Sequence, residues 1–154
     1  MKRIFVLVLS AIIMIFTHTS CSDPIVEKQI IDKDYNWNGY TIVCLDASYP
    51  VFDKSYLLLN TAIQQEIDSW HNIYAELVEE ALQECERDES VASLQRYLTS
   101  SYSVSKKRHE ISVTFDVVYF DGGNSLPSYT KTFTIDLKSG MVYETTVTTQ
   151  RVYT

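Results

Sequence analysis

The longest hydrophobic pattern in the chain lies between residues 54 and 86, where apolar side chains recur every three or four positions. This spacing places them along one side of an amphipathic helix. Asp53 precedes the pattern and can cap the first turn by accepting backbone N–H bonds. Such a helix would measure roughly 50 Å, so a bend or break near residues 69–72 would suit a domain of this size better. The apolar stripe consists of Tyr56, Leu59, Ile63, Ile67, Trp70, Tyr74, Leu77, Ala81 and Cys85.

The segment 109–140 has the alternating pattern of two antiparallel strands joined by a glycine-rich loop. One face of this strand pair is apolar, and the other carries Thr, Ser and Asp, as in a sheet that is covered on one side only. Ser139-Gly140 then turns the chain into a last strand at residues 141–149. The apolar face contains Ile111, Val113, Phe115, Val117, Tyr119, Phe133, Ile135 and Leu137.

Shorter patterns complete the sheet. Residues 40–47 are apolar on both faces, and Tyr49-Pro50 is expected to end this strand because proline cannot donate to a ladder. A short helix is expected from Ser90 through Leu98, and a strand at residues 99–105 leads to a basic turn at 106–108. The fold class is therefore α+β, an antiparallel sheet with one long helix, straight or bent, and one short helix on one face.

The N-terminal residues predict export. Lys2 and Arg3 precede a mainly apolar run at residues 4–16, which is too short for an ordinary membrane span. Thr19-Ser20-Cys21 resembles the end of a bacterial lipoprotein signal, although His18 stands where that signal usually has an aliphatic residue. We expect lipid attachment at Cys21, with an ordinary cleaved signal or an uncleaved anchor as alternatives.

This interpretation divides the chain into a signal at residues 1–21, a tether at 22–37 and a single domain at 38–154. Residues 25–31 can form an edge strand within the tether, and residues 33–39 are typical of a loop and turn.

Charge and cysteine content restrict the partners. The chain has 13 Lys and Arg and 20 Asp and Glu, and the signal takes two of the cations, so the mature charge is 11 − 20 = −9. An acidic domain repels nucleic acid, and also anionic headgroups, so membrane attachment is expected through the lipid on Cys21. Cys44 and Cys85 can form a disulfide in an oxidising compartment or remain as buried thiols.

The chain lacks a recognisable catalytic or metal-binding set, and neither an enzyme nor a cofactor is expected. His71 and His109 have no partner at helical spacing, and no Gly-x-Ser-x-Gly sequence occurs. The acidic residues between 76 and 86 are typical of a solvated helix face.

A ligand-binding site is instead expected at the glycine-rich loop and the aromatic residues that flank it, with an ordinary hairpin loop as the alternative. These residues are Tyr119, Phe120, Gly122, Gly123, Asn124 and Tyr129.

Four pieces of sequence carry a family resemblance: Tyr49-Pro50, the run LNTAI at 59–63, ISVTFDVVYFDGG at 111–123 and the run TIDLKSG at 134–140. Residues 38–141 resemble the domain of unknown function that precedes the catalytic domain of PdaC-type peptidoglycan deacetylases. This domain also forms the extracytoplasmic part of lysozyme-sensing anti-sigma factors. Family members often continue Gly-Gly with Ala-His, whereas Asn124 and Ser125 follow here.

The resemblance implies a non-catalytic, lipid-anchored module of the bacterial cell envelope that binds peptidoglycan or an envelope protein. Two alternatives are a receptor-like sensor for a basic protein such as lysozyme, which a charge of −9 would attract, and a cryptic envelope hydrolase.

Overall fold

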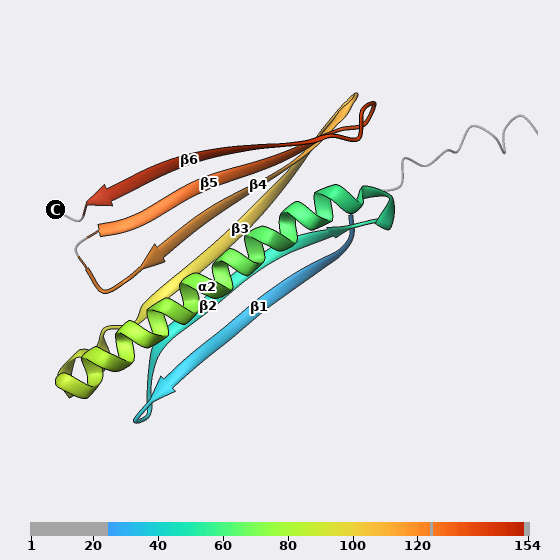
Figure 1. Cartoon of the computed structure of the whole chain (residues 1–154). Helices are drawn as coiled ribbons and strands as arrows, with labels where there is room; N and C mark the ends of the chain where they lie inside the picture. Colours follow the sequence, from blue (N-terminus) through green and yellow to red (C-terminus); the bar gives the residue numbers. More distant parts are fainter. Residues whose placement is uncertain (1–24, 124, 153–154) are drawn as a thin grey trace, which may run out of the picture.

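The computed structural model describes residues 25–123 and 125–152 and contains one six-stranded sheet with a long helix across one face (Figure 1). Neighbouring strands are antiparallel, except that β2 and β3 are parallel because the helix carries the chain back between them. The predicted α+β class is confirmed. In sheet order the strands are β1 (Ile25–Trp37), β2 (Tyr40–Phe52), β3 (Arg96–Lys107), β4 (Glu110–Phe120), β5 (Ser125–Asp136) and β6 (Val142–Val152). The remaining elements are the 3₁₀ turn η1 (Lys54–Tyr56), the helix α2 (Leu57–Arg87) and the 3₁₀ turn η2 (Glu89–Ser93).

The helix α2 is unbroken over its 31 residues, so no break occurs at residues 69–72. Its length of about 46 Å matches the strands, since the 13 residues of β2 extend about 43 Å. The long sheet therefore gives the whole helix a surface to cover. The predicted stripe is the buried side, with Leu59, Ile63, Ile67, Trp70, Leu77, Ala81 and Cys85 all buried. Asp53 accepts a bond from the backbone N–H of Ser55, as a cap should, but at η1 rather than at α2.

The edge strand expected at residues 25–31 is confirmed as the first part of β1, at the edge of the sheet. The loop expected from residue 33 is wrong, because β1 extends to Trp37 and meets β2 through a turn of only two residues, Asn38 and Gly39. Both have positive φ, at 47° and 87°, which is the backbone that a tight hairpin requires.

The expected end of β2 at Tyr49-Pro50 is also wrong. Pro50 lies opposite Lys28 of β1, and β2 continues to Phe52. On its other side β2 pairs with β3 only along Val43–Ala47. Proline is tolerated because no neighbouring strand on that side requires an N–H donor at this position.

The predicted second helix does not form. Residues 89–93 make only the 3₁₀ turn η2, and the chain enters β3 at Arg96. Leu98, expected at the end of that helix, is instead a buried residue of β3. Pairing with both β2 and β4 outweighs the weak local helix pattern.

The two faces of the sheet differ as the alternation predicts. Val113, Phe115 and Phe133 are buried in the core under the helix. The other face carries paired hydroxyls, with Ser112 and Thr134 2.8 Å apart and Thr114 and Thr132 3.0 Å apart. Leu137 departs from the prediction, since it lies beyond the end of β5 and is 39% exposed.

Cys44 and Cys85 are both free thiols, so the disulfide considered from the sequence is absent. Cys85 is buried on α2, whereas Cys44 alternates with Val43 and Leu45, which face the helix. Cys44 therefore lies on the opposite face of the sheet, and the sheet separates the two sulfurs. Burial raises the pKa of both thiols, which keeps them protonated and poorly reactive at neutral pH.

Candidate functional site

A groove lies beside α2, over the part of the sheet that the helix does not cover. Six strands at about 4.8 Å spacing make a sheet about 24 Å wide, whereas a helix is only about 10 Å across. The helix lies over β2 and β3, and β5 and β6 extend past it (Figure 1). The groove has a volume of about 330 Å³. Its lining residues are Glu66, Ser69 and Ile73 of α2 and Tyr119, Tyr129, Lys131, Thr146 and Thr148 of the sheet.

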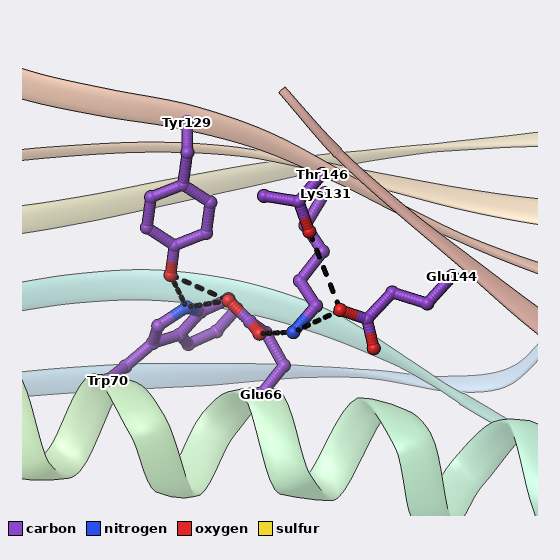
Figure 2. A network of polar contacts seen from close by, with 6 residues as sticks. All are labelled: Glu66, Trp70, Tyr129, Lys131, Glu144 and Thr146. Atoms are coloured by element: carbon purple, nitrogen blue, oxygen red, sulfur yellow. Dashed lines mark hydrogen bonds and ion pairs between the residues drawn. The ribbon is translucent and has the colours of Figure 1, made fainter. Parts of the chain in front are cut away.

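Glu66, Tyr129 and Lys131, which line this groove, belong to a hydrogen-bonded network (Figure 2). Glu66 is 2% exposed, and its Oε1 accepts bonds from Trp70 Nε1 at 2.9 Å and from the Tyr129 hydroxyl at 2.6 Å. Its Oε2 pairs with Lys131 Nζ at 2.9 Å. Lys131 also reaches Glu144 of β6, at 3.0 Å. The network thus joins the helix to β5 and β6, the two strands that extend past it.

The electrostatics of the network fix its protonation at neutral pH. Burial, together with the hydrogen bond to Glu66 and its charge, raises the pKa of Tyr129 above the usual tyrosine range. Burial lowers the pKa of Lys131, but the bonds to Glu66 and Glu144 outweigh it, so the net pKa shift is upward. Tyr129 is consequently a neutral donor and Lys131 a cation, and the groove presents a fixed set of polar groups.

The structure brings together only two of the residues that the sequence predicted for a binding site. Tyr119 and Tyr129 both line the groove. Phe120 lies on the other face of the sheet, where its ring is 5.8 Å from that of Tyr97, because successive strand residues point to opposite sides. Asn124 lies outside the described residues.

Gly122 and Gly123 belong to a loop that packs on a buried arginine. Arg96 is 1% exposed, pairs with Glu84 near the end of α2, and donates from Nε to the Asp121 carbonyl at 2.9 Å. Gly122 has a φ of +94°, and a Cβ there would lie 3.1 Å from the guanidinium. The glycine therefore allows the loop to approach Arg96 closely. This agrees with the alternative stated from the sequence, in which the segment is an ordinary hairpin loop.

We expect Gly122→Ala to lower the free energy of unfolding by about 2 kcal/mol, because it adds both backbone strain and a contact with the guanidinium. Gly140→Ala is a matched control, since Gly140 also has a positive φ, of +71°, but open space around its Cβ position. The control should cost only about 1 kcal/mol. Urea denaturation measures both values, and equal losses would show that the Arg96 contact has no cost.

Sequence reasoning missed the network itself, although two signals point to it. Lys131 occupies the apolar phase of β5, between Tyr129 and Phe133. Glu66 lies on α2 between Ile63 and Ile67 and four positions before Trp70. One opposite charge in the apolar phase of each element predicts that the two elements meet there through an ion pair.

The other predicted features do not assemble into a site. His71 lies on α2 near Lys33, whereas His109 is exposed in the turn after β3. Within residues 25–123 and 125–152, no group of three His, Cys, Asp or Glu side chains is arranged to hold a metal ion. The same ranges contain no helix long and apolar enough to cross a membrane. Cys21, the expected lipidation site, lies outside the described residues.

No protein-family profile matches the chain, and no curated protein matches it. Among solved structures, it is similar to the crystal structure of a DUF3298 family member from Bacteroides fragilis. The two share 14% sequence identity with a TM-score of 0.48, over 79% of this chain and 60% of the other. The chain thus spans about 60% of the length of a structural neighbour whose family is a domain of unknown function.

Proposed function

We propose that this chain is a non-catalytic, lipid-anchored binding module of the bacterial cell envelope, with its ligand in the groove beside α2. The observation that carries the proposal is this groove, in which Tyr119 and Tyr129 lie beside the charged groups of Glu66 and Lys131. The export signal expected at residues 1–21 and the resemblance to the PdaC-type domain support the envelope location.

A glycan such as peptidoglycan suits this arrangement. Sugar rings present apolar C–H faces that pack on aromatic side chains, and their hydroxyls pair with ammonium and hydroxyl groups such as those of Lys131, Thr146 and Thr148. The volume of about 330 Å³ lies at the lower end of small-molecule sites. Thr146 and Thr148 form the outer wall and belong to β6, an edge strand, so a longer polymer can continue past the sheet.

Retention of the protein on purified cell wall tests the proposal that the ligand is a glycan. Tyr119→Ala should weaken retention about tenfold, because it removes one of the two aromatic rings that line the groove, and this corresponds to about 1.4 kcal/mol. Phe120→Ala is the matched control, since it removes a neighbouring aromatic residue of β4 on the other face and should leave retention unchanged. The glycan proposal fails if the natural chain is not retained, or if both variants are retained equally.

Metabolic labelling with an alkyne fatty acid tests the anchor separately. The natural chain should take up the label, and Cys21→Ser should not, because the thiol is the acceptor of the lipid. An unlabelled natural chain would remove the anchor from the proposal while leaving the groove untouched.

A further inference from the structure

Four segments that are distant in sequence meet at one end of the molecule. β2 and β3 run in parallel, so their last residues share an end, and the antiparallel neighbours place the β3–β4 and β5–β6 turns there too. β1 begins at this end, because Ile25 pairs with Phe52, and α2 begins just after Phe52 (Figure 1). We call this the tether end; it comprises residues 25–28, 53–58, 106–110 and 136–141.

The tether end exposes large apolar side chains. Leu57 and Leu58 open α2 and are 67% and 58% exposed, and Met141, in the β5–β6 turn, is 56% exposed. Leu137 in the same turn is also exposed. Single exposed leucines are ordinary, but a group from separate segments at one end marks an interaction surface.

The same segments carry the exposed cations of this end. The tether end contains six cations and four carboxylates, so its net charge is 6 − 4 = +2. The chain after removal of the signal has a net charge of −9, so the rest of that chain carries −9 − 2 = −11. Two of the carboxylates are engaged by the turns, since Asp53 caps Ser55 and Asp136 accepts the N–H of Lys138 at 2.7 Å. The cations are Lys28, Lys54, Lys106, Lys107, Arg108 and Lys138, and the other two carboxylates are Glu27 and Glu110.

The acidic residues gather at the far end instead. Glu84, Glu86, Asp88 and Glu89 lie where α2 ends, about 46 Å from its start. This separation is several times the Debye length of about 8–10 Å in physiological salt. The acidic residues at the far end therefore have little influence on the electrostatic interactions of the tether end. The net charge of −9 does not show which partners the tether end attracts.

We propose that the tether end docks on an anionic lipid surface, with Leu57, Leu58 and Met141 entering the interface and the basic side chains lying over the headgroups. The proposal draws on the anchor in the proposed function: residues 22–24 connect Cys21 to Ile25 and extend about 14 Å at most. A lipid on Cys21 thus keeps this end close to the membrane. Such docking holds the groove, which lies beside residues 66–73 of α2, away from the bilayer and turns the acidic end outward.

Co-sedimentation with vesicles tests the surface without the lipid anchor. The chain that starts at residue 22 contains the whole described core, which lies between Ile31 and Val142. It should bind phosphatidylcholine vesicles that contain phosphatidylglycerol and not those of phosphatidylcholine alone. Arg108→Gln should weaken binding about fivefold. Arg87→Gln, which removes an exposed arginine at the far end of α2, should have no such effect.

A variant in which two leucines are replaced together tests whether the apolar side chains contribute to vesicle binding. The double variant Leu57→Gln and Leu58→Gln should weaken vesicle binding at least about tenfold. Tyr40→Gln with Leu94→Gln removes two exposed apolar residues at the far end and should leave binding unchanged. Absence of vesicle binding, equal binding to both vesicle types, or equal effects of the matched variants would overturn the proposal. Fatty-acid labelling and cell-wall retention report on the proposed function independently of this result.

Discussion

Replacing Trp70 with alanine is expected to lower the free energy of unfolding by about 4 kcal/mol. Trp70 is fully buried under the middle of α2, and its ring meets that of Phe115 edge to face at 5.3 Å. Truncation leaves a cavity and also removes the Nε1 donor from Glu66. Since small domains have about 5–15 kcal/mol of stability in total, the variant should be close to unfolding.

Urea denaturation followed by circular dichroism measures this loss. Trp37→Ala is the matched control, since Trp37 is the other tryptophan, lies half-buried at the end of β1 and should cost at most about half as much. Trp70→Phe keeps an aromatic ring in the core but loses the Nε1 donor and part of the packing, so its cost should be about half that of Trp70→Ala. If Trp70→Ala lowers the free energy of unfolding no more than Trp37→Ala does, Trp70 is not the centre of the core.

Lys131→Met is expected to lower the free energy of unfolding by about 3 kcal/mol, which is the second-largest expected effect. Glu66 is buried with its carboxylate against Lys131 Nζ at 2.9 Å, and methionine leaves that charge without its cation. The methionine side chain retains most of the apolar stem of lysine, so the loss reports mainly on the charge. Lys138→Met, at an exposed turn position, should change stability by less than about 0.5 kcal/mol.

A double-mutant cycle isolates the ion pair. Once Glu66→Gln has removed the buried carboxylate, Lys131→Met should cost at least about 1 kcal/mol less than it does in the natural chain. Glutamine keeps an acceptor for Trp70 and Tyr129, so the rest of the network survives. Strictly additive costs would mean that the two charges do not interact and that the strand and helix meet for other reasons.

These stability effects bear on the proposed binding site, because Glu66 and Lys131 line the groove and Trp70 is bonded to Glu66. Glu66 and Lys131 are held by each other, by Trp70 and by Tyr129, so a ligand in the groove meets groups whose positions are already set. Preorganised groups lower the entropic cost of binding. Tyr119, which lines the groove but has no part in this hydrogen-bonded network, is therefore the better residue for a binding test.

Local patterns were sufficient to predict the α+β class, the buried stripe of α2 and the two faces of β4 and β5. These features depend on side chains within one element, where a period of 3.6 or 2 residues shows which side is apolar. The residues near Arg96 were assigned wrongly for the same reason. Their local helix pattern is weak, and pairing with strands far away in sequence decided their structure.

Only the tertiary structure decided which polar residues meet. Glu66 and Lys131 are 65 positions apart, the difference between 131 and 66, and their contact depends on how α2 crosses the sheet. The same crossing covers β5 and β6 only in part and so creates the groove, while strand alternation places Phe120 on the far face. The tether end cannot be recognised from the order of residues in the chain either, because four segments that are distant in sequence form it. They bring exposed leucines and cations together although the net charge is −9. Periodicity within an element determines what is buried, but the packing of elements determines which charges and rings become neighbours.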